Sequence, residues 1–198
     1  MANTSNDLYR AQTDVSASSA GGAPFLIAYG ATFFITAILS FFISRETAAL
    51  IAMFQGGVAL PFAFWLERKL GSKRMEADNP LRALSAQMAV SQALGLPALI
   101  IAYSLNPATV PVVLAAIGGM HFLPYAWLHR TRIYIILGIT VSIGAFILQL
   151  VLRSAAFSYI LLYVSAVYWI TAPLVYRHAT RLVGGEVSLK QVEIGGRR

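Results

Sequence analysis

The feature that most constrains the fold of this chain is a series of apolar runs whose interiors contain no Asp, Glu, Lys or Arg. Each run is about 20 residues long, which is the length an α-helix needs to cross the hydrocarbon core of a bilayer. Charged residues make up only 12% of the chain, against about 25% in an ordinary soluble domain. The sequence therefore predicts an all-α integral membrane protein.

Six membrane-spanning helices are expected, and together they form one transmembrane domain over residues 23–176. The expected spans are 23–44, 47–66, 81–104, 110–128, 133–152 and 155–176. Residues 1–22 are rich in small polar residues without a sustained period, which predicts a disordered tail. Residues 177–198 are predicted to form a basic tail, broken at Gly184 and ordered only near its start.

The basic residues predict the orientation. With six spans, thirteen of the 15 Lys and Arg residues fall on the side that holds both tails, and only Arg45 and Arg153 fall on the other. Cytoplasmic segments carry the excess of Lys and Arg, so both termini are expected in the cytoplasm, with the protein in a bacterial inner membrane. The net charge of +7 is assigned to topology and to anionic membrane lipids, and no nucleic acid is expected as a partner.

Spans two and four share a sequence pattern. A Gly pair, Gly56-Gly57 or Gly118-Gly119, is followed by Leu-Pro-aromatic-Ala and then by Trp-Leu and Arg. This pattern favours three helical hairpins in a parallel repeat, although Gly, Pro, Trp and Arg also recur at membrane ends for general reasons. In either case, bends are expected near Pro61 and Pro124.

Several kinds of chemistry lack the residues they need. The chain has no cysteine, so thiol catalysis and thiolate metal sites are excluded. The spans contain no carboxylate for ion coupling or for a Ser-His-acid triad and no lysine for a Schiff base. No metal or cofactor is therefore expected, and a non-enzymatic protein is favoured over an enzyme.

The candidate ligand-binding site centres on His121, the only histidine that falls well inside a predicted span. Gly118, His121 and Tyr125 share one helix face, and Pro124 beside them leaves the Met120 carbonyl without its usual amide donor. Other neutral polar residues are expected at a similar depth. The full set of candidate residues is Gly118, His121, Tyr125, Gln87, Ser91 and Tyr168. The same residues are also compatible with plain packing, in which they join helices by hydrogen bonds.

Three functions are compatible with this pattern. The first is binding or conduction of a small neutral or lipid-like solute, with a neutral His121 ring bonded to Gln87, Ser91, Tyr168 or the Met120 carbonyl. The second is a structural or accessory subunit of a homo-oligomer or a larger membrane complex. The third is a lipid-modifying enzyme with His121 as general base, for which the sequence supplies no partner acid.

The run Gly119-Met-His-Phe-Leu-Pro-Tyr-Ala-Trp-Leu128, with Asn79-Pro80-Leu81 upstream, resembles a family of small uncharacterised bacterial multipass membrane proteins. The resemblance covers most of residues 45–176 and leaves out both tails. It implies an architecture and a G-x-H-F-x-P-Y-x-W-L motif, and it carries no activity or catalytic residue over to this chain.

Overall fold

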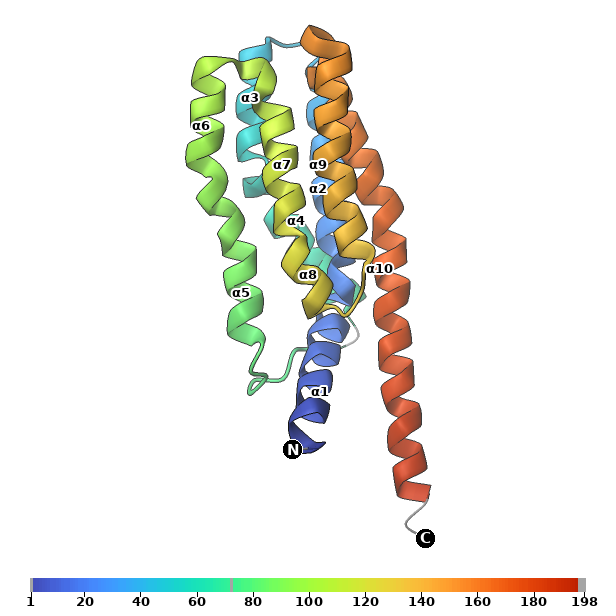
Figure 1. The fold of residues 1–198 in the computed structure, drawn as a ribbon. Helices are drawn as coiled ribbons and strands as arrows, with labels where there is room; N and C mark the ends of the chain where they lie inside the picture. Colours follow the sequence, from blue (N-terminus) through green and yellow to red (C-terminus); the bar gives the residue numbers. More distant parts are fainter. Residues whose placement is uncertain (1, 72, 196–198) are drawn as a thin grey trace.

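The computed structural model describes the backbone of residues 2–71 and 73–195, and side chains over residues 6–184 except those of residues 72 and 89. This described part is helical and contains no strand. The helices are α1 Ala2–Ser18, α2 Ala23–Leu39, α3 Arg45–Phe54, α4 Gly56–Leu70, α5 Arg82–Ser91, α6 Leu96–Leu105, α7 Val110–His121, α8 Leu123–Leu128, α9 Ile133–Leu152 and α10 Ala156–Gly195. They form an elongated bundle with both ends of the chain at the same end, called here the terminal end (Figure 1).

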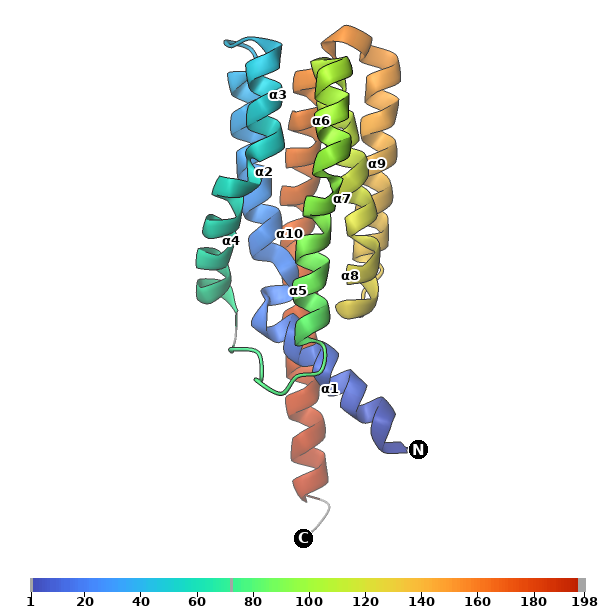
Figure 2. The ribbon, with the colours of Figure 1, turned by 90° about the vertical axis from the view of Figure 1, so that its left-hand side faces the viewer.

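Five helical stretches are long and apolar enough to cross a membrane. They are Ala20–Leu39, Arg45–Leu70, Arg82–Leu105, Pro107–Leu128 and Ile133–Gly184. The last stretch has 52 residues and reverses direction at Arg153–Ala155, where Arg153 adopts a positive φ of 49°. It therefore contains two antiparallel segments, α9 and α10, and the chain traverses the bundle six times, as the sequence predicts (Figures 1 and 2).

Three of the apolar stretches are interrupted, and two of these interruptions end two residues before a proline. The second breaks at Gln55, between α3 and α4, and Pro61 lies further along inside α4. The third contains a 3-10 turn, Gln92–Gly95, and the fourth breaks at Phe122, two residues before Pro124. A proline supplies no amide hydrogen and crowds the carbonyl four residues back, which accounts for the interruption next to Pro124. Whether spans two and four belong to a repeat stays a prediction.

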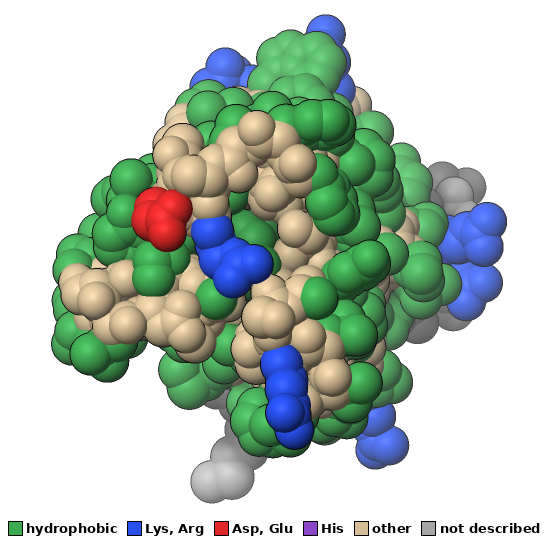
Figure 3. All heavy atoms as spheres, turned by 90° about the horizontal axis from the view of Figure 1, so that it is seen from above, with side chains coloured by type: hydrophobic (Ala, Val, Ile, Leu, Met, Phe, Trp, Pro, Cys, Tyr) green, Lys and Arg blue, Asp and Glu red, His purple; other side chains and the backbone are tan. Residues whose placement is uncertain are grey.

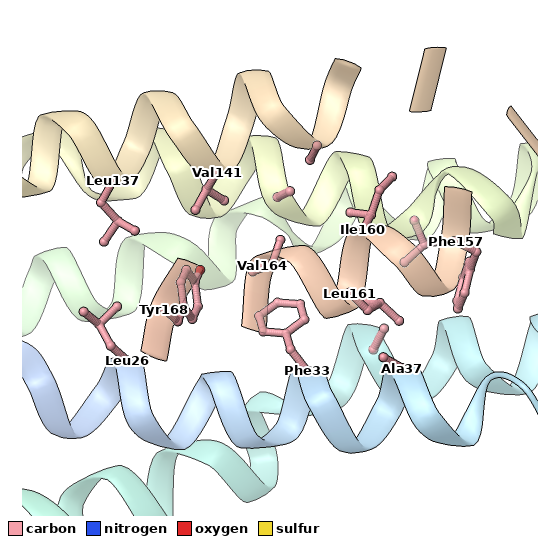
Figure 4. Packing of buried hydrophobic residues seen from close by; sticks show 14 of the residues in the cluster. Leu26, Phe33, Ala37, Leu137, Val141, Phe157, Ile160, Leu161, Val164 and Tyr168 are labelled. Carbon is pink, nitrogen blue, oxygen red and sulfur yellow. The ribbon is translucent and has the colours of Figure 1, made fainter. Parts of the chain in front are cut away.

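The apolar core is built around α10, which packs against α2 on one side and α9 on the other. Figure 4 shows Ile160, Leu161 and Val164 of α10 between the two neighbouring helices, with Phe33 on α2 and Val141 on α9. All five side chains are buried. Such interlocking packing is the main force that joins helices inside a bilayer.

Hydrogen bonds to the backbone of α2 set the register of α10. The Ser165 hydroxyl donates to the Gly30 carbonyl at 2.8 Å, and the Trp169 indole donates to the Ile27 carbonyl at 3.3 Å. The close approach requires a glycine at position 30, because a Cβ there would lie 2.6 Å from the Trp169 indole nitrogen.

The expectation of a disordered N-terminal tail is wrong, because residues 2–18 form α1. All residues from 11 to 17 are buried at the terminal end of the bundle, where α1 runs at an angle to the other helices (Figure 2). The sequence signal is weak because α1 is held largely by polar side chains, so it lacks a continuous apolar stripe. Gly21 and Gly22, with φ of 64° and 82°, adopt the left-handed conformation that turns the chain into α2.

Asp14 joins α1 to the segment between α4 and α5. Its carboxylate lies 2.8 Å from the Lys73 ammonium and accepts hydrogen bonds from the Asn79 amide at 2.7 Å and the Glu76 backbone at 3.0 Å. Burial alone would raise the pKa of Asp14, but the bonds from Lys73, Asn79 and Glu76 outweigh it, and the pKa lies below its ordinary 3.8. The carboxylate is therefore charged and paired at neutral pH.

Gln12 joins α1 to the opposite side of the terminal end. Its amide donates to the Trp127 carbonyl at 2.9 Å and accepts from the Arg130 guanidinium at 3.2 Å. The same guanidinium lies 4.4 Å from the centre of the Tyr9 ring, which is a favourable cation–π distance. The helix is thus tied to two different parts of the chain.

The second correction concerns the C-terminal tail, where α10 continues without a break through Gly184 to Gly195. A glycine inside a helix costs about 1 kcal/mol relative to alanine, which is too little to end this helix.

The end of the bundle opposite the termini differs from the terminal end in its surface. It shows mostly hydrophobic side chains and backbone, with few charged groups (Figure 3).

Replacing Asp14 with Ala should weaken the docking of α1 by about 1–3 kcal/mol, the usual value of hydrogen bonds to a charged group. The measurement is hydrogen exchange of the backbone amides of residues 11–17, which should become faster. Asp7→Ala is the matched control, because Asp7 is exposed on the same helix. Equal exchange rates in the two variants would show that the Asp14 contacts do not hold α1.

Candidate functional site

The candidate site is organised by the break between α7 and α8. Above the break, α7 crosses α9 closely, with Gly119 of α7 against Gly138 of α9. A Cβ added at Gly119 would lie 2.6 Å from the Gly138 carbonyl oxygen, and one added at Gly138 would lie 2.5 Å from the Gly119 carbonyl oxygen. Below it, Phe122 bonds back to the Gly119 carbonyl at 3.2 Å in a 3-10 turn. The break leaves His121 as the last residue of α7.

His121 faces α5 and contacts Ser91. The Ser91 hydroxyl lies 3.4 Å from the His121 Nδ1 atom and donates to the Met88 carbonyl at 2.7 Å. Because the single hydroxyl hydrogen is used on Met88, the serine oxygen is left to accept from an Nδ1–H of His121. Among the residues that the structure describes, none bonds to the second ring nitrogen, Nε2. Of the partners predicted for His121, the structure therefore selects Ser91.

A groove of about 490 Å³ runs between α5 and α8, next to this pair. It is open along its side, and its wall is mostly apolar. Its lining residues are Leu84, Gln87, Met88, Ser91, Pro124 and Trp127. Gln87 and Ser91 are the polar members and lie one helical turn apart. His121 lies behind Ser91, one layer from the groove.

The other predicted site residues divide into two groups. Tyr125 lies beside His121, with ring centres 5.1 Å apart and an edge-to-face arrangement. Gly118 and Tyr168 lie instead on the inner side of α7, away from the groove. A Cβ at Gly118 would be 3.4 Å from the Tyr168 hydroxyl and 3.9 Å from the Gln92 amide nitrogen, which places the backbone of α7 directly beside the phenol.

Tyr168 belongs mainly to the core. Its ring packs edge-to-face against Phe33 at 5.7 Å and against Phe122 at 5.6 Å between ring centres. The Tyr29 phenol lies within electrostatic range of both Tyr168 and Tyr125.

Sequence reasoning missed a second polar cluster, which lies under α1. The rings of His129, Tyr125 and Tyr134 pack in a triangle, with ring centres 5.8 Å apart for His129 and Tyr125, 5.4 Å for His129 and Tyr134, and 5.7 Å for the two phenols. The Tyr134 hydroxyl donates to the Gly21 carbonyl. His129 lies one residue beyond the span expected at 110–128. The spacing of Tyr125 and His129, one helical turn apart, was the signal that could have found the cluster.

His129 connects three separate parts of the chain. Its Nδ1 atom lies 3.0 Å from the Ser16 hydroxyl of α1, and its carbonyl accepts from His178 of α10 at 3.1 Å. Complete burial, with a smaller contribution from His178, lowers the pKa of His129 to about 3. The ring is therefore neutral at physiological pH and acts as a packing and hydrogen-bonding group.

Within the described part of the chain, no group of three or more His, Cys, Asp or Glu side chains could hold a metal ion. Neutral polar atoms and aromatic rings beside an apolar groove can bind an amphipathic molecule by a few hydrogen bonds and by apolar contact.

A family model matches residues 8–178, and its description is a family of unknown function, DUF7010. The chain belongs to this family. The match begins within α1 and so extends beyond the limits of 45–176 inferred from the motif. No curated protein and no solved structure matches the chain.

Acid should loosen α1 through His129. The pKa of His129 falls from an ordinary 6.5 to about 3 on folding, so its contribution to stability is complete above pH 6.5 and is lost as the pH falls towards 3. The protection of residues 11–17 against hydrogen exchange, corrected for the intrinsic exchange rate at each pH, should fall from pH 7 to pH 4.5 in the native chain.

In the His129→Gln variant, the protection of residues 11–17 should fall less over the same pH range than in the native chain, because glutamine does not titrate. The contribution of Asp14 to stability is complete above its ordinary pKa of 3.8 and is lost only below that value, outside this window. An equally steep pH dependence in His129→Gln would exclude His129 as the titrating group.

Proposed function

We propose that the protein is an integral membrane protein whose groove between α5 and α8 binds a lipid-like molecule with an uncharged polar head. Insertion is supported by the five apolar stretches and by large apolar side chains on the outer surface, such as Phe42, Leu94 and Val151, which are 81%, 79% and 71% exposed. A soluble monomer rarely exposes apolar surface on this scale.

We place the terminal end in the cytoplasm of a bacterial inner membrane. The supporting observation is the concentration of Lys and Arg at that end, with only Arg45 and Arg153 at the other. Reporter fusions after residue 198 and at Asn106 should report a cytoplasmic and an external location respectively. The same location for both fusions would contradict the proposed crossing of the membrane.

The open side of the groove is the observation that favours a lipid-like ligand over a water-soluble one. An apolar wall that opens laterally between two helices is reached from the acyl-chain region of a bilayer, whereas a water-soluble solute needs an enclosed aqueous path. Gln87 and Ser91 provide hydrogen-bonding groups within that wall. These residues suit a hydroxyl or ester head, because a charged head would need a counter-charge that the groove lining does not provide.

The accessory-subunit alternative is supported by a different observation. Only 18% of the most apolar part of Arg82–Leu105 is buried, the lowest share of the five stretches, so a partner helix has room to pack there. The lipid-modifying enzyme is favoured less. His121 has a serine and aromatic rings as neighbours, and none of them is the acid that a general base requires as a partner.

The ligand proposal can be tested with Trp127, which lines the groove. The full chain carrying Trp65→Phe and Trp169→Phe is placed in phosphatidylcholine vesicles that contain a diacylglycerol with brominated acyl chains. Bromine quenches the Trp127 fluorescence when an acyl chain lies against this indole, and the variants show whether the lipid is held through His121 and Ser91. His121→Ala should weaken the apparent affinity by up to about fivefold, because Ser91 loses the ring that positions its hydroxyl and a single hydrogen bond is worth about 1 kcal/mol.

His121→Gln keeps a donor and an acceptor and should lose less. Ser91→Ala should resemble His121→Ala. Ser104→Ala is the matched control, because Ser104 also bonds to its own helix and is remote from the groove lining. Unchanged quenching in His121→Ala and Ser91→Ala would remove the basis for this site.

A further inference from the structure

A second groove, of about 410 Å³, lies on the other side of α8, between α8 and the start of α9. Its lining changes character along its length. The apolar part comes from Leu123, Ala126, Trp127 and Ile135, and the polar part comes from Arg130, Thr131 and Arg132 in the link between the helices. No acidic side chain contributes to the lining.

The α8–α9 link has an unusual residue at its turn. Thr131 bonds back to the Ala126 carbonyl at 2.9 Å and Arg130 to the Trp127 carbonyl at 3.2 Å, which is the Schellman pattern that ends a helix. The left-handed position of this motif usually holds glycine, but here it holds Arg130, with φ of 53°. An arginine at that position costs roughly 1–2 kcal/mol, so its side chain must compensate elsewhere.

The Arg130 guanidinium is held in place by α1. It uses one N–H on the Gln12 amide and stacks on Tyr9, which leaves the rest of its five donors for other partners. Arg132 is exposed and lies two residues along the link. Thr131 accepts from the Ile133 amide at 3.3 Å and keeps its own hydroxyl hydrogen for a further acceptor.

We propose that this groove binds an anionic phospholipid, with the headgroup phosphate on Arg130, Thr131 and Arg132 and an acyl chain along Leu123, Trp127 and Ile135. Arginine pairs well with phosphate through two parallel N–H donors, and an indole beside a basic pair is typical of the membrane interface. The inference rests on the proposed insertion in a membrane, but it is independent of the lipid-like ligand assigned to the α5–α8 groove.

The test compares two brominated lipids in the full chain that retains only Trp127. Vesicles contain phosphatidylcholine with either brominated phosphatidylglycerol or brominated phosphatidylcholine as the minor component. We expect stronger quenching by the anionic lipid. Arg132→Gln should reduce the preference for phosphatidylglycerol about tenfold, corresponding to about 1.4 kcal/mol and close to the lower value for a hydrogen bond to a charged group, and Arg132→Lys should retain part of it.

Arg177→Gln is the matched control, because it removes one exposed positive charge from the same end of the bundle and outside the groove. Equal losses in Arg132→Gln and Arg177→Gln would show general attraction by the surface charge and overturn the site. Displacement of phosphatidylglycerol by inorganic phosphate at constant ionic strength would also overturn it, in favour of a free anion. Equal quenching by both lipids would reject the headgroup site while leaving insertion and the α5–α8 groove standing.

Discussion

The contact between α2 and α10 is the interaction on which the rest of the bundle depends. Ser165 and Trp169 of α10 donate hydrogen bonds to backbone carbonyls of α2, and Gly30 allows the two helices to approach closely. The buried apolar side chains of α10 also pack against α9. In a bilayer, apolar side chains gain little by leaving lipid for another helix. Directed bonds of this kind therefore determine which helix faces pack together, and α7 follows because it crosses α9 at Gly119 and Gly138.

The terminal end is held by a different kind of force. There α1 is fixed by charge and hydrogen bonds, through Asp14 to the α4–α5 segment and through Gln12 and Ser16 to the α8–α9 link. Buried polar groups of this kind are costly if a partner is lost. The end of the bundle that carries α1 is therefore sensitive to pH and to single substitutions, whereas the apolar part is stabilised by many small contacts.

Much of the fold could be predicted from the sequence because the length and charge of the apolar runs leave few alternatives. The crossings, the turn at Asn106 and the break before Pro124 all follow from such local rules. Hydrophobicity could not reveal α1, because its buried residues mix small apolar side chains with polar ones. The pairing of Ser91 with His121 was among the predicted options, but the position of Tyr168 behind α7 depends on how three helices pack, which no single span encodes.

The contacts of α1 also bear on which residues a shortened chain must contain in order to fold. The family match, residues 8–178, contains both α1 contacts with Arg130 and the bond from His178 to His129. A truncated chain that starts at α2 would uncover His129, which is 2% exposed in the intact bundle, and would remove the Gln12 and Tyr9 contacts of Arg130. We therefore expect the smallest unit that folds alone to include α1 as well as the apolar helices.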